Sequence, residues 1–218
     1  MSTTARAKRQ ENASESELRA RILDAAFATF MKHGYAASST LEIATRARVS
    51  KRELYALVGN KQEMLVACIS RRAKRFQVPT DLPIPTDRQA LAQLLTSFGA
   101  HLVREITDPT VIAVYRLAIA EATHAPEVAQ ALDSIGREAS RTALRQIMDQ
   151  ALENDLLTGR STELAEQFSG LLWGTLMLNL LLGVAERPSP RDSAARSLNA
   201  VAALLELHPS PSSHRRPS

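Results

Sequence analysis

The sequence lacks several features that define whole classes of protein. Its single cysteine, Cys68, excludes an internal disulfide framework and a cysteine-based zinc site, and is typical of a reducing compartment. The longest apolar run, residues 171–185, is interrupted by Thr175 and Asn179. It falls short of the roughly 18–20 residues that a membrane span needs. The polar N-terminus has no apolar stretch of the kind found in signal peptides. We therefore expect a cytoplasmic globular protein.

The motifs of common catalytic sites are missing as well. The chain has no Gly-x-Ser-x-Gly elbow, no glycine-rich loop for phosphate or dinucleotides, and no His-Glu-x-x-His motif. The histidines are scattered rather than spaced as metal ligands, at His33, His101, His124, His208 and His214. We expect no catalytic residues, no metal site, no cofactor and no enzymatic activity.

Charge divides the chain into two unequal parts. Residues 1–76 contain 15 Lys and Arg against 7 Asp and Glu, whereas residues 77–218 contain 12 against 16. A proline-rich stretch, QVPTDLPIPT, begins at this boundary. The basic part would attract a polyanion such as nucleic acid, although a solvated basic surface is an equally good interpretation of charge alone.

Helix start signals recur in the basic part. A short polar residue followed three positions later by glutamate is the capping-box signature, and it occurs at Ser14/Glu17, Ser39/Glu42, Ser50/Glu53 and Asn60/Glu63. After the first, apolar residues recur every four positions, which predicts a helix over about residues 16–33 that Gly34 ends. Residues 1–14, with Arg6, Lys8 and Arg9, are expected to form a disordered basic arm that adds salt-dependent attraction to DNA or enters a minor groove.

Two of these start signals lie only eleven residues apart. A helix from Thr40 must therefore stop near Ala47, and the next must begin after Ser50. Two short helices joined by a tight turn indicate a helix-turn-helix motif. Ile43, small Ala44, Val49, Leu54 and Leu57 occupy the positions where the two helices would face each other.

These segments together resemble the TetR family of transcriptional regulators. The resemblance covers residues about 19–65, in RILDAAFATFMKHGY, SSTLEIATRARVSKRELY and NKQEML. It implies an all-α fold: a helix-turn-helix DNA-binding domain over residues 15–60, a connecting helix over 60–76, and a ligand-binding and dimerisation domain over 77–207. A disordered tail is expected over 208–218. Arg48 departs from the family pattern, because glycine is usual in that turn, and a left-handed backbone there would cost about 1 kcal/mol.

Candidate DNA contacts gather at the helix starts. In the first turn of the second short helix, Lys51 or Arg52 would donate to guanine O6 and N7 in a major groove. Glu53 has two candidate roles, as an acceptor from cytosine N4 or, favoured here, as the partner of Ser50 in a helix cap. The resemblance implies that Thr40, Tyr55 and Lys61 contact the phosphate backbone. Ser39 and Ser50 are further candidates for DNA contacts. Tyr55 has a competing interpretation as a core residue.

The second part of the sequence predicts further helices near 87–106, 109–123, 127–154, 162–185 and 191–207. Residues 116–132 and the helix containing Trp173 are similar to the AefR-type subclass of the family. Aromatic residues and methionine at helical spacing are more often core, and a histidine on a helix is more often a surface residue or one with its hydrogen bonds satisfied. With that alternative open, the candidates for a pocket that binds a small-molecule effector lie on the middles of these helices: Phe98, His101, Tyr115, Glu121, Phe168, Trp173, Met177 and Asn179.

The stretch GLLWGTLMLNLLLGVA is apolar on all sides, so burial against a second subunit is expected. The resemblance implies a homodimer formed by the last two helices of each subunit, on a palindromic operator in double-stranded DNA. The recognition helices of the two subunits would then lie roughly 34–36 Å apart or more, which matches the spacing of operator half-sites. The resemblance thus implies a dimeric repressor released by a small molecule. An activator and a helical protein-interaction module with a basic domain remain the alternatives.

Overall fold

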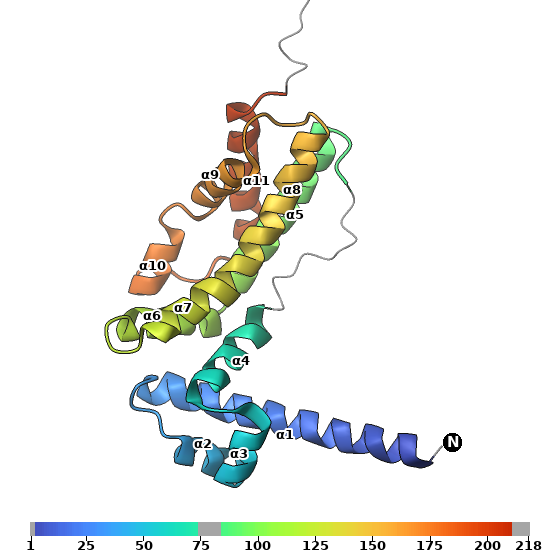
Figure 1. The fold of residues 1–218 in the computed structure, drawn as a ribbon. Helices are drawn as coiled ribbons and strands as arrows, with labels where there is room; N and C mark the ends of the chain where they lie inside the picture. The colour runs from blue at the N-terminus through green and yellow to red at the C-terminus, as the bar shows by residue number, and fades with distance from the viewer. Residues whose placement is uncertain (1–2, 74–83, 211–218) are drawn as a thin grey trace, which may run out of the picture. The chain divides into compact units, whose positions relative to one another are not determined.

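The structure, a computed structural model, describes residues 3–73 and 84–210. Helices and their connections make up all of these residues, and no strand occurs among them (Figure 1). This confirms the all-α prediction. Within the same residues, no helix combines the length and the apolar character needed to cross a bilayer.

The chain folds as two compact units. The first joins residues 1–73 to residues 113–136, and the second contains residues 74–112 and 137–218. This division differs from the predicted boundary, because residues 113–136 were expected in the second domain. The helices of the first unit are α1 (Thr3–His33), α2 (Thr40–Ala47), α3 (Lys51–Val58), α4 (Lys61–Ala73), most of α6 (Pro109–Glu121), α7 (Pro126–Ala131) and most of the π-helical segment η2 (Leu132–Arg137).

The core of the first unit is built from one apolar face of each helix. Phe30 of α1, Ile43 of α2, Leu54 of α3 and Met64 of α4 have no exposed surface. Val128 of α7 belongs to the same cluster. Burial of such side chains contributes about 1.5–3 kcal/mol each, so the helix-turn-helix is held to both α1 and the segment that follows α6.

The first helix is longer than predicted. α1 begins at Thr3, not near Ser16, and runs through Ser14 without a break. Over residues 3–14 this helix differs from the disordered arm predicted for residues 1–14, of which residues 1–2 lie outside the described part, and no helix begins at the predicted Ser14/Glu17 cap. The segment contains no glycine or proline and is rich in Ala, Arg, Lys, Gln and Glu, which are strong helix formers.

The second unit packs α11 (Pro190–Leu207) against α5 (Arg88–Ile106) and α9 (Ser161–Trp173). α8 (Glu138–Glu153) packs against α9 and α5. At the α5–α11 contact, the buried Ser197 hydroxyl donates to the Thr96 carbonyl at 2.9 Å. A Cβ atom on Gly99 would lie 2.3 Å from that hydroxyl oxygen, so the two helices approach closely because position 99 has no side chain.

Of the long helices predicted in this part of the chain, one is continuous and one is interrupted. The helix expected over 127–154 is helical from Pro126 to Glu153, with the π-helical η2 between α7 and α8, whereas the one expected over 162–185 is divided into α9 and α10 (Leu176–Leu182). Gly174 ends α9 with φ 45° and ψ −126°, a backbone conformation that is unfavourable for residues with a side chain. Of the predicted tail, residues 208–210 are not helical and residues 211–218 lie outside the described part.

Candidate nucleic-acid interface

The N-terminus of α3 is fixed by a capping box. The Ser50 hydroxyl accepts from the Glu53 amide at 3.1 Å, and Glu53 Oε2 accepts from the Ser50 amide at 2.8 Å. Lys51 and Arg52 follow directly, and both side chains are exposed. The first turn of α3 therefore presents two cations at the positive end of the helix dipole, an arrangement that favours a polyanionic partner.

The same geometry decides between the two roles considered for Glu53. Its carboxylate is engaged by Ser50, and these hydrogen bonds lower the pKa of Glu53. The cap is confirmed, and the structure does not support the competing role as a cytosine acceptor. An analogous pair precedes α4, where the Asn60 amide donates to Glu63 at 2.6 Å and Asn60 Oδ1 accepts from the Glu63 amide at 3.0 Å.

The turn between α2 and α3 depends on one left-handed residue. Arg48 has φ 54° and ψ 49°, and its amide donates to the Thr45 carbonyl at 3.1 Å. The next amide, of Val49, donates to the Ala44 carbonyl at 3.0 Å. Ala44 is buried, which agrees with its predicted place between the helices. The turn therefore has the geometry expected of a helix-turn-helix, with arginine where the family pattern has glycine.

Two arginines of α1 hold the C-terminal ends of the helix pair. Arg21 Nε donates to the Ala47 carbonyl at 2.9 Å, and Arg19 Nε donates to the Leu57 carbonyl at 3.3 Å. Cations at these helix ends complement the negative end of each dipole. These contacts join residues 26 and 38 positions apart, so no local pattern in the sequence predicts them.

The start of α2 also contacts α3. Ser39 caps α2 by accepting from the Leu41 amide at 3.2 Å, and Thr40 Oγ1 lies 3.1 Å from the Tyr55 hydroxyl. Tyr55 is 46% exposed, so its interpretation as a core residue was wrong. The expected capping box of α2 is incomplete, because Glu42 lies 3.0 Å from His33 Nε2 instead of turning back to Ser39.

Lys61, at the start of α4, lies against the turn between α1 and α2. Its Nζ donates to the Ala36 carbonyl at 3.0 Å and lies 4.7 Å from the centroid of the Tyr35 ring. Burial lowers the pKa of Lys61, and the nearby carboxylates of Glu121 and Glu127 oppose that shift. Burial also raises the pKa of Tyr35, with Glu127 contributing in the same direction. The predicted phosphate contact therefore belongs to a charged cluster.

The eight candidate ligand residues do not form one group. Phe98 and Phe168 are buried in the second unit, whereas Trp173, Met177 and Asn179 are partly exposed near the end of α9 and on α10. His101 is partly exposed, with Nδ1 3.5 Å from an Arg104 nitrogen. Tyr115 and Glu121 belong to the first unit instead. Glu121 accepts a hydrogen bond from the Ala36 amide at 3.1 Å.

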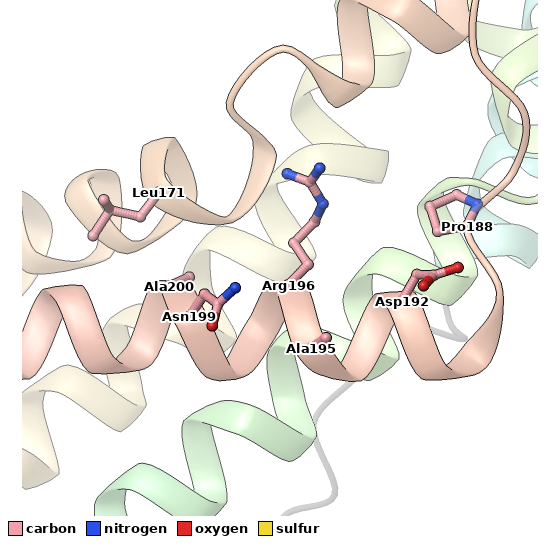
Figure 2. Close-up of a pocket in the computed structure, with 7 residues that line it drawn as sticks. All are labelled: Leu171, Pro188, Asp192, Ala195, Arg196, Asn199 and Ala200. Carbon is pink, nitrogen blue, oxygen red and sulfur yellow. The ribbon is translucent and has the colours of Figure 1, made fainter.

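An open hollow of about 420 Å³ lies on the surface of α9 and α11. Figure 2 shows the Arg196 side chain pointing from α11 toward the end of α9. Leu171 lies on α9, to the left of Arg196 in this view. Arg196 donates to the Leu172 carbonyl at 3.2 Å. None of the candidate ligand residues lines this hollow. The residues that line it are Leu171, Pro188, Asp192, Ala195, Arg196, Asn199 and Ala200.

Comparison with known proteins identifies this architecture. Residues 22–68 match the model of bacterial regulatory proteins of the TetR family. Residues 93–207, more than half of the chain, match the C-terminal domain of AefR-like transcriptional repressors. The chain belongs to the TetR family of transcriptional regulators, a family of non-enzymatic proteins.

Individual relatives agree with this assignment. An HTH-type transcriptional repressor of Streptomyces coelicolor is 35% identical over 85 residues, which span 38% of this chain and 43% of that relative. A TetR regulator of Agrobacterium tumefaciens is 27% identical with a TM-score of 0.73, over 90% of this chain and 97% of that one. The flavonoid-responsive regulator FrrA is 25% identical with a TM-score of 0.75, over 90% and 98%.

Proposed function

We propose that the chain is a sequence-specific DNA-binding repressor that acts as a homodimer and is released from its operator by a small molecule. The observation that carries the proposal is the pair of exposed cations, Lys51 and Arg52, on the capped first turn of α3. In helix-turn-helix proteins the N-terminal residues of the second helix contact base edges in the major groove. Family membership and the repressor from Streptomyces coelicolor support this role.

The dimer is supported by exposed apolar residues on α9, α10 and α11. Leu171 of α9, Leu178 and Leu182 of α10, and Leu198 of α11 are 38–67% exposed. Isolated exposed leucines are ordinary, but several on neighbouring elements are typical of an interface. A Cβ at Gly170 of α9 would meet nothing within 4 Å. A second subunit would cover this face and place two recognition helices on the halves of a palindromic operator.

A small-molecule effector is supported by family membership and by FrrA, whose name describes it as flavonoid-responsive. The abundant Leu and Ala of the second unit favour an apolar or mixed ligand. To cause release, such a ligand must bind more tightly to a form whose recognition helices do not match the operator.

Base preference tests the role of the recognition helix. Purified protein is titrated with operator duplexes in which single G·C pairs are replaced, one in each duplex. The titration is repeated with Arg52→Ala and with Lys51→Ala. One of these variants should lose discrimination of about 1–3 kcal/mol at one G·C pair. Arg160→Ala, which removes an exposed cation from the second unit, is the charge-matched control. Base preferences unchanged in both variants would overturn the assignment.

A further inference from the structure

A buried carboxylate of α6 is tied to the DNA-binding helices. Glu121 is only 8% exposed, and its Oε1 accepts from the Ala36 amide in the turn between α1 and α2. A buried carboxylate is costly unless it is hydrogen-bonded and near a positive charge, and here both conditions are met. The positive charge is that of Lys61, which interacts with Glu121 electrostatically.

The glycine that ends α1 makes room for this carboxylate. Gly34 has φ +79°, and a Cβ there would lie 2.8 Å from Glu121 Oε1. The Gly34 amide donates to the Phe30 carbonyl at 3.0 Å, and the buried Ser38 hydroxyl donates to the Gly34 carbonyl at 2.6 Å. The Ser38 hydroxyl also lies 3.2 Å from the Thr29 carbonyl of α1, so the turn is anchored to α1 at both ends. Glu121 holds its middle residue, Ala36.

Ala36 connects Glu121 to Lys61. Its amide donates to Glu121, while its carbonyl accepts from Lys61 Nζ at 3.0 Å. The ring of Tyr35 lies beneath the same ammonium group, with Phe30 at 5.4 Å between ring centroids. The position of the ammonium group therefore depends on where Ala36 and Tyr35 lie.

We propose that Glu121 is a positioning residue for DNA binding: by anchoring Ala36 it holds the Lys61 ammonium group where it contacts an operator phosphate. The inference rests on the proposed function, because it requires the protein to bind an operator. It gives Glu121 a role other than that of a ligand-pocket residue. It also explains why a carboxylate is kept beside a surface that must bind a polyanion, where the charge alone would weaken binding.

The salt dependence of DNA binding tests the inference. The probe is the duplex that the purified protein selects from a random-sequence library, and affinity is measured from low to moderate salt. Lys61→Met should lower affinity several-fold and reduce the slope of log K against log salt by about 0.9 for each bound subunit. Glu121→Ala should have the same effect, even though it removes a negative charge. Glu121→Gln keeps an oxygen acceptor for Ala36 and should rescue both affinity and slope.

Two controls separate anchoring from charge and from folding. Glu127→Gln removes the other carboxylate near Lys61, keeps an oxygen acceptor for the Tyr35 hydroxyl and leaves the Ala36 contact in place, so it should keep the wild-type slope. Combining Lys61→Met with Glu121→Ala should cause no further loss of slope, because both changes remove the same contact. Thermal unfolding confirms that each variant is folded at the assay temperature.

The outcomes are distinguishable. Failure of the wild-type protein to select any duplex counts against the proposed function itself. If the wild type binds and Glu121→Ala raises affinity with an unchanged slope, Glu121 is only a repulsive charge and the inference is overturned. An equal loss of slope in Glu127→Gln would likewise overturn it, because the effect would then be one of local charge.

Discussion

At the residue scale, Arg48 illustrates how a functional turn tolerates backbone strain. A non-glycine residue in the left-handed region costs roughly 1–2 kcal/mol, and Arg48 is held there by its place between two helices whose crossing buries Ala44. The sequence identified this position as unusual, because glycine is common there in the family. The left-handed conformation of Arg48 confirms that this position favours glycine because of its backbone geometry.

Replacing Arg48 with glycine should raise the free energy of unfolding by up to about 1 kcal/mol, since glycine adopts the left-handed conformation without a steric penalty. Urea denaturation of the two proteins measures the difference. Arg46→Gly is the matched control, because Arg46 is an exposed residue within α2 and glycine there should destabilise by about 1 kcal/mol. A loss of stability in Arg48→Gly would contradict the strain argument.

Glu53 gives a pH-dependent prediction. Hydrogen bonds with Ser50 lower its pKa in the folded protein, so the ionised form stabilises the fold. This contribution is complete above the ordinary glutamate pKa of about 4.3 and is lost as the pH falls through the lower, folded-state value. The difference in unfolding free energy between wild type and Glu53→Ala should therefore be present at pH 7 and should shrink as the pH is lowered below about 4.3. A difference that stays constant as the pH falls would count against the cap.

At the element scale, the sequence predicted what local signals determine. The limits of α2 and α3 follow from start signals at Ser39 and Ser50 and from the short spacing between them. The contact between Ala36 and Glu121 joins residues 85 positions apart and leaves no local signal. The break at Gly174 was missed because the surrounding residues are mostly apolar, so that nothing in the pattern distinguishes a helix end from a glycine within a helix.

The packing of α5 against α11 depends on Gly99. Gly99→Ala would place a methyl group 2.3 Å from Ser197 Oγ and 3.0 Å from Phe168 Cζ, and Phe168 is completely buried. We expect a loss of about 1–3 kcal/mol in unfolding free energy from this overpacking, measured by urea denaturation. Adding Ser197→Ala removes the nearest atom and should recover part of the loss. If Gly99→Ala alone leaves the free energy of unfolding unchanged, the space between α5 and α11 can accommodate a methyl group and the overpacking argument fails.

At the scale of the whole molecule, binding to a palindromic operator requires two copies of the chain. Leu178 and Leu182 lie four residues apart on α10 and are 58% and 67% exposed. Replacing both with glutamate should convert a dimer to a monomer at micromolar concentration, because charges are disfavoured at the core of an interface. Light scattering measures the mass. Ile119→Glu, at an equally exposed position on α6, should leave the dimer intact, and a dimer that survives the double replacement would place the interface elsewhere.

The central claim is that the basic first unit binds DNA by sequence and not by charge alone. The most direct test is a gel-shift titration of the purified protein on DNA from upstream of its own gene, with excess unrelated competitor and at low and moderate salt. We predict a shift that survives the competitor at moderate salt. A shift that the competitor abolishes, on this DNA and on duplexes selected from a random library, would contradict the claim, because it would show only the salt-sensitive attraction of a basic surface.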